Sequence, residues 1–207
     1  MYVGSGHLKL PPQVRTGVNL TSYAELAVRL VNTAYRANDD PDPLGAIDSF
    51  SVLVDDHPHL AAAVTLFDLD ALRALRGELA DVFIATATGR DGDAVARLNG
   101  LLARSSVQPE LVSHEGDDRW HLHLADAGSV ADRYAAGAVI ALTLVISQFG
   151  LRRLGVCSIA SCQRVFIDAS PNRSRRYCTE HCAPRTNVTT IRGQGRADGG
   201  HAATAAS

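Results

Sequence analysis

Four cysteines carry the clearest chemical signal in this chain. Cys157, Cys162, Cys178 and Cys182 are the only cysteines among its 207 residues, and their spacing is C-x4-C-x15-C-x3-C. Two closely spaced thiolate pairs separated by a short segment are typical of tetrahedral zinc sites. A site whose four ligands all come from the protein has no open position for a substrate. We therefore predict one structural Zn2+ bound by these four cysteines.

Other uses of the cysteines are less consistent with the sequence. Two disulfides are typical of small secreted chains that are dense in cysteine, but residues 1–20 lack the basic patch and apolar run of a signal peptide. An iron–sulfur cluster fits the ligand spacing less well than zinc does. His181 lies between the last two cysteines and is an alternative ligand, which the paired thiolate spacing disfavours.

The charges are distributed unevenly along the chain. Residues 1–150 carry 11 Lys and Arg against 19 Asp and Glu, a net charge of −8, whereas residues 151–196 carry nine Arg against Asp168 and Glu180, a net charge of +7. Arginine binds phosphate with two parallel hydrogen bonds and can read guanine edges. We therefore predict nucleic-acid contacts by Arg164, Arg173, Arg175, Arg176, Arg185 and Arg192. Alternatively, these arginines cover the zinc module or dock on an acidic surface.

The segment before residue 150 has the periodicity of a mostly helical domain. A capping box of Ser22 and Glu25 predicts a helix over residues 23–37, and a short helix is expected over 47–54. Asp68 or Asp70 is expected to cap a helix that ends near Gly89, and Asp91 or Asp93 to cap the next. A helix over 129–149 contains the longest apolar run, which is too short to predict a membrane span.

Two hairpins complete the predicted α+β fold. The helical period breaks over 107–112 and 119–124, and apolar and polar residues alternate in the second of these segments, which predicts a β-hairpin around the polar loop 113–118. Between the two cysteine pairs we expect a second hairpin with strands over 165–167 and 175–178, followed by a helix that carries the last ligands. The C-terminal module would then be a small treble-clef-like zinc finger.

Composition divides the chain into four segments. We expect an irregular arm over 1–20, an α-rich domain over 21–150, a zinc finger over 151–192 and a disordered tail over 193–207, which is rich in Gly and Ala. The hydrophobic fraction of 46% is sufficient for a real core in the α-rich domain.

The chain resembles the CGNR zinc-finger family, whose members carry an N-terminal ABATE-type domain. The resemblance is most specific between the cysteines, where an aromatic residue and the pattern D-x-S-x-N-x-x-R are formed by Phe166, Asp168, Ser170, Asn172 and Arg175. The segment Leu30 to Thr33 is similar to the "NT" signature near the start of the ABATE domain. The four letters that name the family read Cys182, Ala183, Pro184 and Arg185 here.

The resemblance implies a bacterial, cytoplasmic, stress-induced transcription regulator that binds DNA through its finger. The sequence contains none of the motifs H-E-x-x-H, G-x-S-x-G or G-x-x-x-x-G-K-[ST], nor a dinucleotide glycine fingerprint, so we expect no catalytic residues. The alternative is a protein-interaction module with a structural zinc, which oxidation of the thiolates could release. A homodimer and a small-molecule effector are compatible with this reading, but no residue identifies either.

Overall fold

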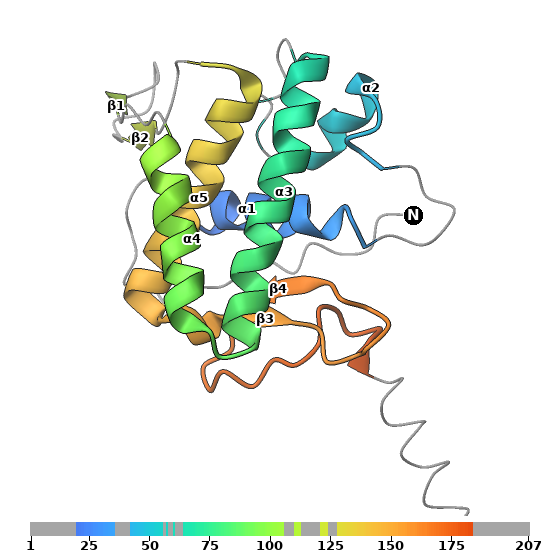
Figure 1. Cartoon of the computed structure of the whole chain (residues 1–207), viewed down its shortest axis with the longest axis vertical. Helices are drawn as coiled ribbons and strands as arrows, with labels where there is room; N and C mark the ends of the chain where they lie inside the picture. Colours follow the sequence, from blue (N-terminus) through green and yellow to red (C-terminus); the bar gives the residue numbers. More distant parts are fainter. Residues whose placement is uncertain are drawn as a thin grey trace, which may run out of the picture.

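A computed structural model describes residues 20–35, 42–55, 57, 60, 64–105, 110–112, 121–123 and 128–183. Its helices are α1 (Leu20–Asn32), α2 (Ile47–Phe50), α3 (Leu66–Ala87), α4 (Asp91–Arg104) and α5 (Val130–Phe149). Its strands are β1 (Glu110–Val112), β2 (His121–His123), β3 (Leu154–Val156) and β4 (Val165–Ile167). Figure 1 shows α3 and α4 side by side, α1 passing behind α3, and the β3–β4 hairpin below α3. The expected α+β class with a mostly helical first part is confirmed.

Two of the helices begin at reciprocal capping boxes. The helix expected over 129–149 is confirmed as α5, and its cap is Ser129, whose hydroxyl accepts from the backbone N–H of Asp132 at 3.1 Å. The cap of α3 is Thr65, and the expected cap Asp68 instead accepts the Thr65 backbone N–H at 2.8 Å. Asp68 also accepts from the backbone N–H of Ala131 at 2.9 Å. This buried carboxylate therefore joins the starts of α3 and α5.

The predicted bounds of the first helix are wrong. α1 begins at Leu20, so Ser22 lies inside the helix and not at its cap, and the Ser22 hydroxyl is 2.5 Å from Nε2 of His57. α1 also ends at Asn32, earlier than expected. The short helix expected over 47–54 is confirmed as α2 followed by a 3-10 helix over Ser51–Leu53. α4 begins at Asp91 but has no side-chain hydrogen bond at its cap.

The core of the body is the contact between α1 and α5, which α3 and α4 extend. α5 is rich in alanine, and a side chain at Gly137 would place its Cβ 2.5 Å from the Tyr23 ring, so a glycine is required for this close approach. α5 is long and apolar enough to cross a membrane, but more than half of its apolar stretch is buried inside the protein. Its burial is that of a core helix.

Of the two predicted hairpins, one is confirmed and one is wrong. β1 and β2 pair antiparallel with Glu110 opposite His123, as expected; the loop 113–118 lies outside the described residues. β4 does not pair with residues 175–178. It pairs antiparallel with β3, with Val156 opposite Val165. The hairpin therefore encloses the first cysteine pair and does not lie between the two pairs.

Candidate metal centre

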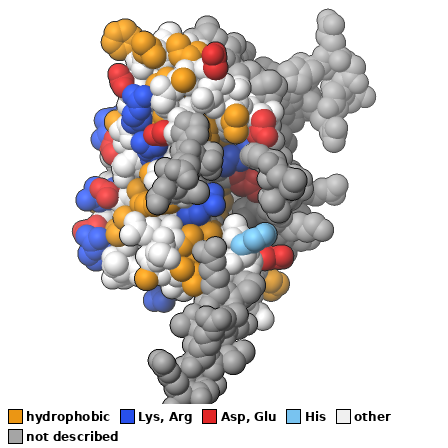
Figure 2. All heavy atoms as spheres, turned by 90° about the vertical axis from the view of Figure 1, so that its right-hand side faces the viewer, with side chains coloured by type: hydrophobic (Ala, Val, Ile, Leu, Met, Phe, Trp, Pro, Cys, Tyr) orange, Lys and Arg blue, Asp and Glu red, His pale blue; other side chains and the backbone are white. Residues whose placement is uncertain are grey.

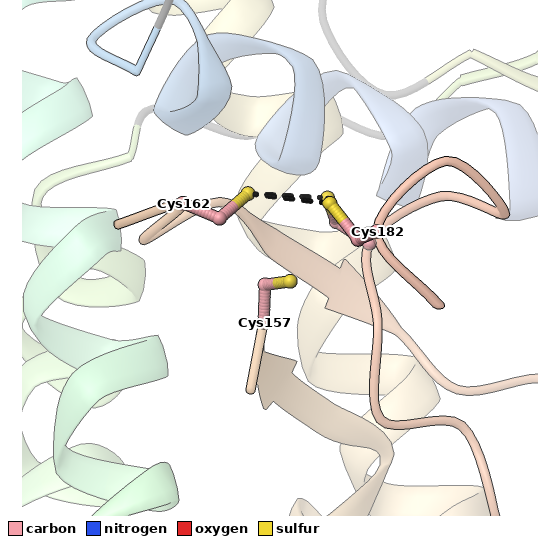
Figure 3. Close-up of side chains that lie close together, drawn as sticks. Cys157, Cys162 and Cys182 are labelled. Carbon is pink, nitrogen blue, oxygen red and sulfur yellow. Dashed lines mark hydrogen bonds between the residues drawn. The ribbon is translucent and has the colours of Figure 1, made fainter. Parts of the chain in front are cut away.

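The four cysteine sulfurs converge on one point. All four Sγ atoms lie within 4.8 Å of one another. The Sγ of Cys178 is 3.5 Å from that of Cys162 and 3.6 Å from that of Cys182, and the Cys162–Cys182 distance is 3.8 Å. Figure 3 shows Cys157, Cys162 and Cys182 pointing toward one another. The sulfurs are too far apart for disulfides, whose S–S bond is about 2.05 Å.

These distances match the requirements of a zinc ion. Four sulfurs at about 2.3 Å from Zn2+ in a tetrahedron are about 3.8 Å from one another. Three of the four cysteines are buried and Cys162 is half-buried, so the arrangement leaves no solvent-facing position for a substrate. The cluster consists of the four predicted cysteines, and His181 is exposed and not part of it. The geometry therefore fits one structural zinc.

The surroundings of the thiols favour a bound cation. Burial, together with the neighbouring thiols of Cys162 and Cys182, raises the pKa of Cys178 far above its usual value. Burial also opposes ionisation of Cys157, but backbone N–H groups of Cys178 and Ile159 outweigh it and lower the pKa of that thiol. Four adjacent thiolates repel one another unless a dication lies between them. A bound metal would stabilise the deprotonated sulfurs and so close the loop around them.

The hairpin between the cysteine cluster and the helices is buried on both faces. Val165 and Ile167 of β4, with Leu154 of β3, belong to the same hydrophobic core as α1, α3 and α5. Phe166, which points the opposite way, packs with Cys157, Cys178 and Cys182. Side chains alternate between the faces of a strand. β4 is therefore a partition with the helical body on one side and the metal cluster on the other.

Asp168 organises the turn between the cysteine pairs. Its carboxylate accepts from the backbone N–H groups of Ser170 at 2.7 Å and of Arg175 at 3.0 Å. Burial alone would raise the pKa of Asp168, but the hydrogen bonds from Ser170 and Arg175 outweigh it and lower the pKa below its usual value. The ionised carboxylate therefore stabilises the folded turn at neutral pH, and this contribution is lost as the pH falls through the lowered pKa.

The Asp168→Ala substitution is expected to destabilise the zinc-loaded protein by about 1–3 kcal/mol, because it leaves two partly buried N–H groups without their acceptor. Asp168→Asn, which keeps one carbonyl oxygen, should cost less. The measurement is denaturant unfolding in the presence of zinc. Ser174→Ala is the control, since Ser174 is exposed in the same turn and its hydroxyl makes only a 3.4 Å contact. Equal stability of Asp168→Ala and Ser174→Ala would contradict this role.

The side chain of Arg175 stabilises the finger through contacts with the finger's own residues. Its guanidinium lies 4.8 Å above the centre of the Phe166 ring, and it donates to the backbone carbonyls of Ile167, Tyr177 and Cys178. Phe166 in turn covers Gly155, where a side chain would place its Cβ 2.5 Å from the ring. These side-chain bonds to the backbone replace the strand ladder that was expected over residues 175–178. Arg153 acts similarly, since it donates to the carbonyls of Asp168 and Ser170.

The other predicted contact residues lie in different surroundings. Arg173 and Arg176 are exposed, and within the described ranges their side chains form no hydrogen bond or ion pair. Arg152, beside the hairpin, is also exposed and also forms no such bond there. Arg164 is half-buried, and its Nε has no hydrogen-bond partner. Arg185 and Arg192 lie outside the described residues. The helix expected to carry the last ligands is not formed over 178–182, where the chain makes turns, and its continuation beyond residue 183 lies outside the described part.

The arginines of the helical body, in contrast, are largely paired. Arg97 lies 2.8 Å from Asp81, Arg76 lies 2.8 Å from Asp42, and Arg104 pairs with Glu78. Figure 2 shows acidic and basic side chains next to one another along the left side of the face of the molecule that it draws. Within the described part of the chain, no arginine between 152 and 176 forms such a pair with a carboxylate of the body.

Comparison with known families gives two matches, which together cover most of the chain. Residues 24–145 match the ABATE model, described as "Putative stress-induced transcription regulator", and residues 153–194 match the model described as "CGNR zinc finger". Neither description is that of an enzyme family. No curated protein matches the chain.

Proposed function

Because this chain belongs to the ABATE family and carries a CGNR zinc finger, we propose that it is a DNA-binding transcription regulator, cytoplasmic and without catalytic activity. In this proposal the segment 21–150 is the regulatory domain and the segment 151–192 is the DNA reader. Cys157, Cys162, Cys178 and Cys182 hold the zinc. The zinc has a structural role, because it fixes the turns that present the arginines.

The observation that supports DNA binding is the set of unpaired arginines beside the metal cluster. Arg152, Arg173 and Arg176 are exposed, carry no carboxylate partner within the described residues, and project from segments adjacent to the metal cluster. The planar guanidinium fork matches the geometry of phosphate and loses less conformational entropy for each hydrogen bond that it forms. Arg175 is a poor candidate for direct contact because its donors are directed to the finger's own backbone.

The double substitution Arg173→Ala and Arg176→Ala is expected to weaken binding to duplex DNA of mixed sequence. If both side chains reach phosphates, the slope of log affinity against log salt should become shallower by about 1.8, since each phosphate contact contributes about 0.9. The measurement is a mobility shift at several salt concentrations. Zinc content and thermal stability should stay at their wild-type values, because both side chains are exposed.

The matched control is Arg97→Ala, which removes one arginine from the helical body where it pairs with Asp81. That variant should bind DNA with the wild-type salt slope. Unchanged affinity and slope in the double variant would contradict DNA contact by these arginines. The alternative, a protein-interaction module that docks on an acidic partner, would be supported if the zinc-loaded wild-type protein failed to bind the duplex at low salt.

A further inference from the structure

Asn32, the last residue of α1, forms two hydrogen bonds to the backbone of one residue of β4, Val165. Its Nδ2 donates to the carbonyl of Val165 at 3.0 Å, and its Oδ1 accepts from the backbone N–H of Val165 at 2.8 Å. The two residues are 133 positions apart in sequence. A side-chain amide has the same donor and acceptor as a peptide group, so Asn32 pairs with the free edge of β4 as a neighbouring strand would.

This pairing is the polar part of an otherwise apolar contact. Val165, Ile167 and Leu154 bring the hairpin into the core of the helical body. Among the described residues, no other side chain of the body forms a hydrogen bond with the hairpin. Apolar contacts are not directional, whereas the two bonds of Asn32 fix the position of β4 along α1. From this geometry we infer that Asn32 is a positioning residue that couples the helical body to the zinc loop.

The peptide group between Arg164 and Val165, which donates to Asn32, also accepts the hydrogen bond that positions Cys157. The carbonyl of Arg164, immediately before Val165, accepts from the backbone N–H of Cys157 at 2.8 Å. Val165 is also opposite Val156, the residue before Cys157. A displacement of β4 would therefore move the backbone that orients Cys157. A single peptide group, that between Arg164 and Val165, therefore connects the end of α1 to the first zinc ligand: its N–H donates to Asn32 and its carbonyl accepts from Cys157.

The other end of this connection is fixed to the body. Thr33, next to Asn32, is buried; its hydroxyl donates to the carbonyl of Leu30 at 2.7 Å and accepts from Arg76 of α3 at 2.9 Å. Arg76 also contacts Asp42 at 2.8 Å. The end of α1 is thus held by α3, and a change in α1 would reach the zinc loop through Asn32. By linkage, zinc binding must affect α1 to the same extent.

The test uses the full-length, zinc-loaded protein and does not depend on DNA binding. Asn32→Asp keeps the acceptor but loses the donor and places a negative charge near the Val165 carbonyl. We expect zinc transfer to a chromophoric chelator to be faster by on the order of tenfold, the effect of losing one or two hydrogen bonds. Amide exchange at Val165 and Cys157 should accelerate as well. Asn32→Ala removes both bonds without adding a charge and should give the same result.

The matched control is Tyr134→Phe, which removes a buried hydrogen bond of 2.8 Å from α5 to the Leu26 carbonyl of α1 and leaves the finger untouched. It should lower thermal stability and release zinc at the wild-type rate. The inference is overturned if the Asn32 variants release zinc at the wild-type rate, or if Tyr134→Phe accelerates release equally. In the wild-type protein, the NMR signals of the Asn32 side-chain amide should shift when zinc is removed, and unchanged signals would also overturn it.

Discussion

Replacing Cys178 with serine is expected to reduce the bound zinc from one ion per chain to nearly none. Its sulfur lies 3.5 Å and 3.6 Å from two other ligand sulfurs, so it is a central member of the cluster. A serine hydroxyl stays protonated at neutral pH and is a poor ligand for zinc. Structural zinc contributes on the order of 10 kcal/mol to the folding of small zinc modules. The finger should therefore lose its ordered turns, as measured by metal content and by amide exchange over 157–182.

His181→Ala is the control for this substitution. His181 lies within the last ligand pair, but its side chain is exposed and outside the cluster. The variant should retain one zinc per chain with wild-type affinity. If His181→Ala loses the metal while Cys178→Ser retains it, the assignment of four thiolate ligands is wrong.

Removing zinc from the wild-type protein is expected to destabilise the helical body as well as the finger. Leu154, Val165 and Ile167 are buried in the same core as α1, α3 and α5. If the hairpin detaches, these three side chains leave that core. The burial of each contributes about 1.5–3 kcal/mol to the stability of the folded protein. The helical circular dichroism signal should consequently melt at a lower temperature, by on the order of ten degrees or more.

The control for metal removal is readdition of different ions to the chelated protein. Zinc should restore the original melting temperature, whereas magnesium should not, because Mg2+ requires oxygen ligands. Melting of the helices at the same temperature with and without zinc would show that the finger folds independently.

The metal ligands could be predicted because their signal is local. The spacing of the four cysteines and the D-x-S-x-N-x-x-R pattern both lie within one short segment, and the first residue of that pattern, Asp168, accepts from the backbone N–H groups of Ser170 and Arg175. α5 was predictable for the same reason, since Ser129 and the apolar run that follows fix its start and its burial.

The pairing of β4 could not be predicted from the sequence. Val165 to Ile167 reads as a strand, but its partner depends on contacts that are distant in sequence. Residues 175–178 were the expected partner because they are the next extended segment. In the structure, the Arg175 side chain instead donates to backbone carbonyls of the finger. The strand that pairs with β4 is β3, whose Leu154 is buried in the core of the helical body.

Asn32 lies in the segment that resembles the "NT" signature of the family, but the sequence does not indicate what its side chain binds. A single asparagine at the end of a helix ordinarily predicts a cap. Only the structure shows that its amide pairs with Val165. The roles of Thr65 and Arg153 were also missed: Thr65 caps α3, and Arg153 donates to the carbonyls of Asp168 and Ser170. Each depends on a partner whose position only the fold determines.

X-ray absorption at the zinc edge of the purified, reduced full-length protein tests the central claim most directly, because it reports the ligands themselves. The account predicts one zinc per chain with four sulfur neighbours at about 2.3 Å and no nitrogen or oxygen neighbour. A first shell that contains nitrogen or oxygen, or protein that contains no zinc, would contradict it.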